Sequence, residues 1–539
     1  MTNKQIAYAF DELANLMELH EEDEFRIRSY RNAYLALRKT DTPLTEMTEP
    51  DLKAIKGVGN AIAGKILELT RDGKMQNLEK YRAQTPPGVV EMLEVNGFGP
   101  KKVRVVWKEM GIESVGELWY ACNENRLIEY KGFGLKTQEE LRKKLEYYLK
   151  SRNSLHLNTA LDEGRRVQEL IAQRLPSAKM EWTGDLRRLC PTISQLEGLI
   201  AAESPLDALF DPEILILEKQ EGDRFQARFE DNIPIVLHRC TVADFGSKQF
   251  LHTGNRAFVE AFAATQSGIN FKGIATEQGI FDKANLPYVA PELRDHPQAL
   301  TWMQQNSVPK LIEASDIKGV LHIHTTWSDG LHTLREMCEY ARQSGYAYIG
   351  ITDHSQSAFY ANGLKPDRVL AQMADIDALN MEMAPFRILK GIESDILNDG
   401  NLDYDEAFLE KFDFVIASVH SNLKMTIEKA TARIIRAIEH PATTILGHPT
   451  GRLLLSREGY PLDWDAVLEA CARHHTAIEL NANPYRLDID YTLIPKALAH
   501  GIKISINPDA HSKQGIHDIR YGVMVARKGG LTPEMHFSI

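Results

Sequence analysis

Several features are scarce or absent in this chain of 539 residues, and each absence excludes a class of protein. No apolar run approaches the roughly 20 residues that span a bilayer, so we expect no membrane segment. The five cysteines are scattered and show no CxxC spacing. Neither a disulfide framework nor a cysteine-based zinc knuckle is therefore indicated. The N-terminus lacks the basic and then apolar layout of a secretory signal, which predicts a cytoplasmic protein.

An excess of positive charge is also missing, since the formal net charge is −12. This balance argues against a protein that coats nucleic acid along its whole length, although local basic segments can still bind it. The length exceeds what one hydrophobic core can serve. Shifts in pattern predict four domains, at residues 1–85, 86–154, 155–315 and 316–539, and we expect a monomer.

One short pattern occurs three times in the first 150 residues: IKGVGNAIAGKI, VNGFGPKKVRVV and YKGFGLKTQEEL. In each, an apolar residue precedes Gly-x-Gly, and a helix-like segment follows. A single copy would indicate only a helix end followed by a new helix. Three copies resemble helix-hairpin-helix motifs, which grip the DNA backbone through amides at a helix start. The candidate DNA contacts are Gly57, Gly59, Lys65, Gly97, Gly99, Lys101, Lys102, Gly132, Gly134 and Lys136, with Arg104 adding positive charge.

The pattern changes twice in the rest of the chain. Residues 155–315 mix helices with short strands, which predicts an antiparallel sheet flanked by helices. From Lys318 onward, seven apolar runs alternate with amphipathic helices. Strands that alternate with helices form parallel βα units, and seven such units predict a barrel or near-barrel.

Six of the seven runs end in residues of metal-binding type. The carboxyl ends of parallel strands open on one face, so these side chains should converge. Imidazoles and carboxylates suit Zn²⁺, Mn²⁺ or Fe²⁺, and there are too many for one ion. A cluster of two or three ions is predicted. The alternative for any single histidine is a polar surface or core group. The candidate ligands are His322, His324, Asp329, His354, Glu393, His420, His448, Asp509 and His511.

Closely spaced metals favour hydrolysis of a phosphate ester, because one ion generates hydroxide at neutral pH and together they clamp the reacting oxygens. Arg452 follows the His448 run and is a candidate for holding the substrate phosphate; a surface salt bridge is the alternative. The expected nucleophile is a metal-bound hydroxide, positioned by His322, His324, Asp329, Glu393, His420 and Asp509.

The motifs HIHTTWSDG, ITDHS, GIESD, SVHS, GHPTGR and NPDAHS resemble the polymerase-and-histidinol-phosphatase (PHP) domain. With the three hairpins and the middle region, nearly the whole chain resembles bacterial family X DNA polymerases that carry a C-terminal PHP domain. The resemblance implies a distorted seven-stranded βα barrel with three metal ions held by the same nine residues. It also implies manganese-dependent 3′-5′ exonuclease and related 3′-end or abasic-site activity in base excision repair.

The middle region departs from that family's polymerase signature, which is a Gly-Ser turn, two basic residues and a strand with Gly-Asp-x-Asp. Within TGDLRRLCPTISQLEGLI, Asp185 replaces the serine, and Gln195 and Glu197 replace the two aspartates. The third family aspartate falls on Val236. These side chains cannot form a two-metal site with three carboxylates. The polymerase site is therefore predicted to be inactive.

Other family positions are partly kept. The incoming-nucleotide motif has become Thr253-Gly254-Asn255, whereas Arg187 and Arg188 remain candidate phosphate contacts. Lys65 matches the Schiff-base lysine of family members with deoxyribose-phosphate lyase activity, but a neighbouring family lysine is replaced by Ala61. A phosphate contact or a solvated helix residue are the alternatives for Lys65.

These patterns together predict a DNA 3′-end phosphoesterase whose substrates are gapped, nicked or 3′-recessed DNA. The alternatives are a noncatalytic scaffold that binds DNA gaps or ends, and a phosphatase that acts on a small phosphate ester. An intact set of nine ligands argues against the scaffold. The hairpins argue against the small-molecule phosphatase, which would have no use for them.

Overall fold

The computed structural model describes residues 3–40, 42–95, 97–150, 154–202, 205–230, 233–266 and 270–538. The chain divides into two compact units. The first comprises residues 1–123 and 127–149, and the second comprises residues 124–126 and 150–539. Among the described helices, none has the length and hydropathy needed to cross a membrane.

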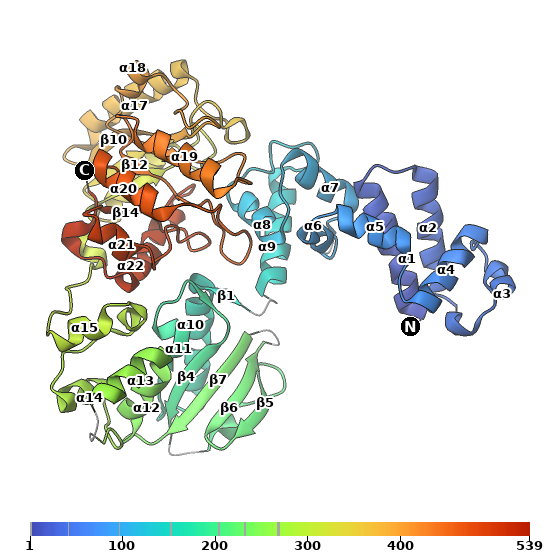
Figure 1. Ribbon diagram of the computed structural model, residues 1–539, viewed down its shortest axis with the longest axis horizontal. Coiled ribbons are helices and arrows are strands. Elements are labelled where there is room, and N and C mark those ends of the chain that lie inside the picture. The colour runs from blue at the N-terminus through green and yellow to red at the C-terminus, as the bar shows by residue number, and fades with distance from the viewer. Residues whose placement is uncertain are drawn as a thin grey trace. The chain divides into compact units, whose positions relative to one another are not determined.

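The first unit is helical (Figure 1). Helices α1 and α2 pack together through buried side chains such as Phe10 and Tyr30, whose rings lie 6.2 Å apart. Asp23 caps the second of these helices by accepting a hydrogen bond from the Arg26 amide. The helices are α1 (Asn3–Leu19), α2 (Glu24–Leu37), α3 (Glu49–Ala54), α4 (Asn60–Asp72), α5 (Gln76–Gln84), α6 (Pro87–Met92), α7 (Pro100–Arg104), α8 (Val115–Asn123) and α9 (Leu135–Lys150).

The second unit begins with a five-stranded sheet and its helices. The sheet has the order β2-β4-β7-β6-β5. The sequence patterns predict an antiparallel sheet, and this prediction is wrong. The sheet is mixed, because β4 and β7 pair in parallel. The chain crosses from β4 to the far edge at β5 and returns, so β7 runs in the same direction as β4. The elements are β1 (Leu155–His156), α10 (Leu157–Arg174), β2 (Lys179–Thr183), α11 (Gly184–Arg187), β3 (Thr192–Ile193), β4 (Leu196–Ala201), β5 (Leu215–Glu221), β6 (Arg224–Phe229), β7 (Ile233–Cys240), α12 (Phe245–Thr253), α13 (Arg256–Thr265), α14 (Glu277–Ala284) and α15 (Ala299–Gln304).

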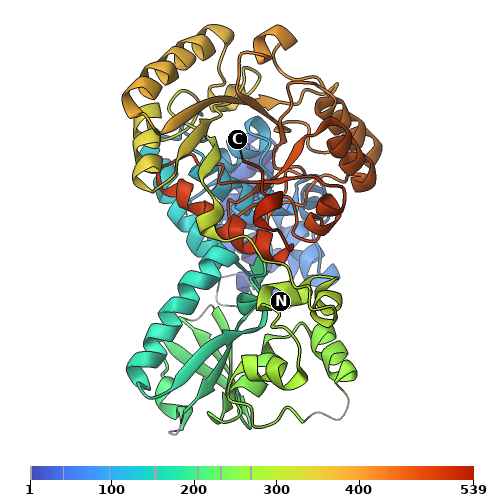
Figure 2. The same cartoon turned by 90° about the vertical axis from the view of Figure 1, so that its left-hand side faces the viewer.

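The remainder of the second unit is a parallel barrel, as predicted, with strand order β14 to β8 in sequence. The last strand region returns to the first: the Ala510 amide donates to His322 O, and the His324 amide donates to Ala510 O. Figure 2 shows the helices on the outside of the strands. The elements are β8 (Gly319–Ile323), α16 (Leu334–Gln343), β9 (Tyr348–Ile351), α17 (Pro366–Met383), β10 (Arg387–Asp395), α18 (Glu406–Leu409), β11 (Phe414–Ser418), α19 (Ile427–Ile438), β12 (Ile445–Leu446), α20 (Trp464–His474), β13 (Ala477–Asn481), α21 (Ile494–Ala499), β14 (Ile504–Asn507) and α22 (Ile519–Lys528).

Side-chain alternation divides the barrel interior into an apolar end and a polar end. Leu389, Gly391 and Glu393 are two apart on β10 and therefore share one face. The Phe414 ring fills the space beside Gly391, where a Cβ would lie 2.5 Å from the ring. Leu389 and Phe414 belong to one buried apolar cluster. The apolar part of the barrel interior therefore ends two residues before Glu393. Glu393 itself lies toward the carboxyl end of β10.

Candidate metal centre and nucleic-acid interface

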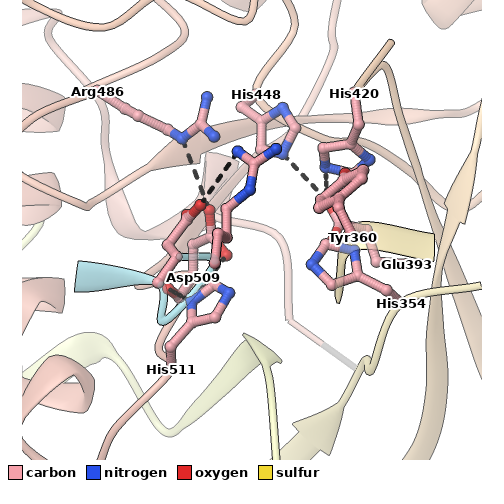
Figure 3. A pocket seen from close by; sticks show the side chains of 10 residues that line it. His354, Tyr360, Glu393, His420, His448, Arg486, Asp509 and His511 are labelled. Atoms are coloured by element: carbon pink, nitrogen blue, oxygen red, sulfur yellow. Dashed lines mark hydrogen bonds and ion pairs between the residues drawn. The ribbon is translucent and has the colours of Figure 1, made fainter. Parts of the chain in front are cut away.

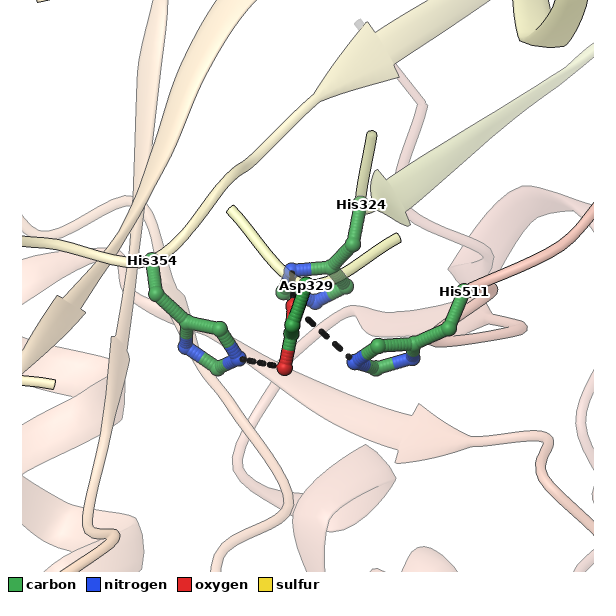
Figure 4. A group of neighbouring side chains, drawn as sticks. All are labelled: His324, Asp329, His354 and His511. Carbon is green, nitrogen blue, oxygen red and sulfur yellow. Dashed lines mark ion pairs between the residues drawn. The ribbon is translucent and has the colours of Figure 1, made fainter. Parts of the chain in front are cut away.

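The barrel brings all nine predicted ligands together at the carboxyl ends of its strands. They form four overlapping groups, and within each group the potential ligand atoms lie within 4.8 Å of one another. Figure 4 shows one group, in which three imidazoles surround the carboxylate of Asp329. The groups are His324, Asp329, His354 and His511; His322, Glu393 and His448; His322, His324 and Asp509; and His354, Glu393 and His420.

Glu393 lies at the centre of this arrangement. Its Oε1 is 3.1 Å from His322 Nε2, 3.1 Å from His420 Nε2 and 3.0 Å from His448 Nε2. Its Oε2 is 2.9 Å from His354 Nδ1. Its Oε2 also lies 3.7 Å from His324 Nε2, so one carboxylate faces five imidazoles and would be shared by neighbouring ions if they bind here.

Two further carboxylates link the remaining histidines. Asp509 Oδ1 lies 3.4 Å from His322 Nε2 and 3.2 Å from His324 Nε2. Asp329 Oδ2 is 3.5 Å from His354 Nε2, and its Oδ1 is 3.6 Å from His511 Nε2 (Figure 4). The loop that carries Asp329 therefore folds back over the strand ends.

Many polar atoms of this cluster are buried without a hydrogen bond. A buried polar atom without a partner costs about 1–3 kcal/mol, so native proteins seldom keep several in one place. A divalent cation would accept a lone pair from one nitrogen of each histidine and from the carboxylate oxygen. Imidazole and carboxylate donors suit such an ion, and the residues therefore fit a metal centre. The atoms are His322 Nε2, His324 Nδ1 and Nε2, His354 Nδ1, Glu393 Oε2, His448 Nδ1 and His511 Nε2.

The electrostatics of the cluster favour ionised acids. Burial alone would raise the pKa of Glu393, but the His420, His322 and His354 imidazoles outweigh it and hold that pKa well below its usual range. Burial would likewise raise the pKa of Asp509, and its imidazole neighbours reverse the shift. Burial lowers the pKa of His324, aided by the neighbouring imidazoles. Anionic carboxylates and a neutral imidazole are the forms that bind metals.

Two of the candidate ligands have an unusual backbone. His322 has φ of +61° and Asp509 has φ of +52°, in the left-handed region that non-glycine residues seldom adopt. Such strain costs about 1–3 kcal/mol and concentrates at functional sites. At His322 it accompanies an irregularity in the pairing of β8 with β9. Both residues belong to the same group of potential ligands, with His324.

The sequence patterns missed two carboxylates that orient these histidines. Glu479 on β13 accepts a hydrogen bond from His322 Nδ1 at 2.6 Å and another from the His448 amide. Asp395 Oδ1 accepts from His420 Nδ1 at 2.7 Å. Each contact places the proton on Nδ1 and directs Nε2 into the cluster. For Glu479 the available signal was a carboxylate within the apolar run AIELN, on the one strand without a predicted ligand.

A pocket opens beside the cluster, and Figure 3 shows its lining. Arg486 points into it, with Nε 3.8 Å from Asp509 Oδ2. Arg452, the predicted phosphate contact, is absent from the lining. Its guanidinium instead forms an ion pair with Asp490 at 2.5 Å and donates to the carbonyls of Arg486 and Leu487. Arg452 therefore braces a loop, and the arginines that line the pocket with the candidate ligands are Arg126 and Arg486.

The altered polymerase positions lie together on the five-stranded sheet. Glu197 on β4 is the register partner of Val236 on β7. Gln195 donates from Nε2 to Glu197 Oε1 at 2.5 Å. Asp185 lies on the adjoining α11 and accepts from Arg188 at 2.5 Å. Only one carboxylate is present where the family signature places three.

The two arginines of that region are engaged in internal ion pairs. Arg187 binds Glu277 through both nitrogens of its fork, at 2.6 and 2.8 Å. Glu277 is also paired with the buried Arg294 at 2.7 Å. Burial would raise the pKa of Glu277, but the two arginines lower it to about 2.

Arg188 forms the second internal pair. It lies 3.1 Å from Asp295, which also binds Lys528 of the last helix, α22. Lys528 in addition donates to the carbonyl of Arg188 at 3.1 Å. These contacts hold the arginine-bearing turn against the barrel. The guanidinium groups predicted to meet a phosphate thus neutralise carboxylates of this chain.

The three Gly-x-Gly turns share one geometry. Gly57, Gly97 and Gly132 have φ of +96°, +78° and +95°, which favours glycine at each position. The middle residue of each turn is buried and donates its amide to a carbonyl three residues earlier. Gly59 and Gly99 cap α4 and α7, and Gly134 immediately precedes α9. All six glycines are exposed, so the helix starts can approach a ligand.

The basic residues near these turns differ in their surroundings. Lys101 and Lys136 are exposed, whereas Lys102 is half-buried and lies 6.0 Å from the Phe133 ring. Arg104, expected to add charge beside a phosphate, forms an ion pair with Glu21 at 2.5 Å. Burial lowers the pKa of Lys65, which is half-buried on α4.

Three family models match the chain. Residues 1–75 match a helix-hairpin-helix domain, residues 89–146 a SAM-like helix-hairpin-helix tandem, and residues 321–483 the PHP domain. The chain is 34% identical to the DNA polymerase/3′-5′ exonuclease PolX of Bacillus subtilis, over 98% of this chain and 96% of that protein. A probable phosphatase of Thermoanaerobacter sp. is 29% identical over 41% of this chain and 90% of its own length. A probable phosphatase of Syntrophotalea carbinolica is 26% identical over 40% of this chain and 88% of its own length.

Proposed function

The chain belongs to the PolX family of DNA polymerase/3′-5′ exonucleases, and we propose that its barrel hydrolyses phosphate esters at DNA 3′ ends while its polymerase site is inactive. The observation that carries the proposal is the cluster of nine convergent ligands with its unsatisfied buried atoms. The hairpins would hold gapped, nicked or 3′-recessed DNA. Three divalent ions, Mn²⁺, Zn²⁺ or Fe²⁺, would occupy the four overlapping ligand groups.

Divalent ions held by these residues would supply Lewis acidity and a nucleophile at neutral pH. The protein's own contribution begins with proton placement. Glu479 and Asp395 hold the protons of His322 and His420 on Nδ1, so that each Nε2 presents a lone pair. Glu393 and Asp509 supply the negative charge that balances the cations. Burial of the cluster excludes bulk water and strengthens these interactions.

The proposal that the polymerase site is inactive rests on the number of carboxylates it contains. Two-metal nucleotidyl transfer needs several carboxylates around the ions. Here Glu197 faces Val236 across the parallel pair, and Gln195 already donates to Glu197. Asp185 would also repel a triphosphate. The remaining role of this region is to support the barrel and to contribute to DNA binding in repair.

The probable phosphatases, which match 41% and 40% of this chain, favour a second candidate, a PHP phosphatase that acts on a small phosphate ester. A noncatalytic scaffold is the third. The candidates differ in substrate. An exonuclease shortens DNA, a small-ester phosphatase leaves DNA intact but cleaves a phosphomonoester, and a scaffold binds gaps without cleaving either.

The test is incubation of labelled 3′-recessed, gapped and single-stranded DNA with the protein and Mn²⁺. A His322→Ala/His324→Ala variant serves as the matched control, since it removes two ligands of one group. Shortening by the wild type alone is expected. Tight gap binding without shortening under Mn²⁺, Zn²⁺ or Fe²⁺ would contradict the proposal. A parallel reaction with dNTPs tests the polymerase site, and template-dependent extension would show that it is active.

A further inference from the structure

Asp353 is a buried carboxylate beside the metal cluster that is not one of the nine candidate ligands. It is 0% exposed and immediately precedes the candidate ligand His354. Thr325 donates to it from both its amide and its hydroxyl, at 2.8 Å each. Ser328 donates from its amide at 3.1 Å and from its hydroxyl at 2.5 Å, and Gln372 Nε2 donates at 2.6 Å. All these donors are neutral, and acceptance from so many of them is the pattern of an ionised carboxylate.

The Thr325 and Ser328 donors lie on the segment that joins two candidate ligands. Thr325 directly follows His324, and Ser328 directly precedes Asp329. Ser328 Oγ also lies 3.2 Å from Asp329 Oδ1. A hydroxyl carries one proton, and the shorter contact, to Asp353, identifies its acceptor. Asp353 therefore fixes both ends of this segment and leaves Asp329 without that proton.

The same loop is attached to a further candidate ligand. The Leu331 amide donates to the carbonyl of His511 at 2.8 Å, and the Gly330 amide donates to that of Thr325 at 2.9 Å. A Cβ at Gly330 would lie 2.6 Å from the carbonyl oxygen of His324, so the loop packs tightly on the strand end. Asp353 and this loop thus connect the four residues of one ligand group, His324, Asp329, His354 and His511 (Figure 4).

Other carboxylates support the histidines of the remaining groups. Glu479 accepts from His322 Nδ1, and Asp395 accepts from His420 Nδ1. Each of these two acids contacts a ligand directly. Asp353 differs from both, because its hydrogen bonds go to the loop between ligands and are confined to one group.

We propose that Asp353 is a positioning residue that assembles one metal position of the cluster, the group of His324, Asp329, His354 and His511. This assignment rests on the proposed function. The hydrogen bonds of Asp353 hold the Asp329 loop in place before a cation binds, so less conformational entropy is lost on binding. The charge of Asp353, which faces only neutral donors, also favours a cation nearby. Loss of Asp353 therefore weakens this position and spares the others.

The number of Mn²⁺ ions bound per chain tests the assignment. It is counted by elemental analysis after the full-length protein is dialysed against a series of Mn²⁺ concentrations. Asp353→Asn keeps the size of the side chain but removes its charge and places an amide among donors. We expect one ion fewer per chain at limiting Mn²⁺, with a dissociation constant for that position raised about 10- to 100-fold, as for other acids that support metal ligands. Excess Mn²⁺ should restore the wild-type count.

Two substitutions of Thr325 form a milder pair, which decides the matter if Asp353→Asn does not fold. Thr325→Val keeps the shape of the side chain but removes the hydroxyl that donates to Asp353, and it should weaken the same position. Thr325→Ser keeps the hydroxyl and should bind Mn²⁺ as the wild type does. Thr443→Val is the matched control, because this buried threonine donates to the Ala437 carbonyl at 2.6 Å and precedes β12, away from the strand ends that carry the ligands.

An unchanged ion count and affinity in Asp353→Asn or Thr325→Val would overturn the assignment. Equal weakening of every bound ion would also overturn it, because Asp353 would then only stabilise the barrel. DNA cleavage is measured separately. If the wild type binds Mn²⁺ but fails to shorten DNA, the proposed function fails, and the ion counts still decide the assignment. If the wild type shortens DNA and the variants bind Mn²⁺ as it does, the proposed function stands and the assignment fails.

Discussion

Two clusters of buried charge lie in the same unit and differ in whether their polar atoms are satisfied. Around Arg187 and Arg188, guanidiniums face carboxylates at hydrogen-bonding distance. At the barrel end, acids and imidazoles crowd together while seven of their buried atoms have no hydrogen bond. A structural network of charges thus differs from a candidate ligand site: the first neutralises itself, whereas the second leaves buried polar atoms that a cation could bind.

The largest expected effect is a loss of stability when the network of ion pairs around Arg187 and Arg188 is broken. Glu277→Gln leaves Arg187 and Arg294 without their shared carboxylate, and breaking a buried ion pair in this way costs about 3–5 kcal/mol. The free energy of unfolding in urea measures the loss. Glu382→Gln, which removes the exposed partner of Arg335, should cost far less, because solvent screens an exposed ion pair. Equal losses of unfolding free energy in the two variants would mean that the buried ion pairs of Glu277 stabilise the fold no more than an exposed ion pair does.

The next effect concerns the incomplete cluster. Glu393→Gln keeps the shape of the side chain but removes the charge that faces five imidazoles. We expect Mn²⁺ affinity and DNA hydrolysis to fall by about 100-fold or more, as for loss of a metal ligand. Calorimetric titration with Mn²⁺ measures the first, and cleavage of labelled DNA the second. Wild-type metal content in this variant would mean that Glu393 is not a ligand.

A smaller effect follows from pH. Burial lowers the pKa of His296 to about 4, and its Nδ1 accepts the Gln298 amide, which requires a neutral ring. The unfolded histidine has a pKa near 6.5, so only the unfolded state gains a proton between pH 6.5 and 4. Stability therefore falls as the pH drops through that window. The contribution is about 0.5–1 kcal/mol between pH 7 and 5.5, after allowance for solvent screening.

Urea unfolding of the metal-free protein at pH 7 and pH 5.5 checks this prediction. His296→Asn retains an acceptor near Nδ1 but does not titrate, so its stability should fall less than that of the wild type. The other histidines are common to both proteins, and their contributions cancel in the difference. The same pH dependence in both proteins would refute the role of His296.

No effect is expected from rebuilding the family aspartates alone. In Gln195→Asp/Glu197→Asp/Val236→Asp, Asp185 still occupies the serine position, and Arg187 and Arg188 stay in their ion pairs. Primer extension with dNTPs should remain at background. Extension by this variant but not by the wild type would show that the missing aspartates alone make the polymerase site inactive.

Much of this molecule follows from local patterns in the sequence. Each barrel strand is an apolar run that ends in a polar residue, so the spacing of the βα units alone placed nine residues, from His322 to His511, at one face. The three turns were equally local, because a positive φ between two helices favours glycine. In both cases, the information lies within a few residues of the feature, and repetition distinguishes it from chance.

Other features depended on contacts between distant segments. The parallel pairing of β4 with β7, the closure near Ala510, and the carboxylate of Glu479 beside His322 join residues far apart in the sequence. The same holds for the two arginine roles: Arg452 and Arg486 each lie near candidate ligands, and only the loop contacts decide which braces and which faces the pocket.

Periodicity and backbone preference act locally, so the residue types at the strand ends and turns can be predicted from the order of the amino acids. Tertiary structure alone decided which charges are paired. Arg187 and Glu277 are 90 residues apart, and no spacing rule connects them. The sequence does not distinguish an arginine that binds a phosphate from one that neutralises a buried acid. The difference lies in the partner that folding places beside the guanidinium.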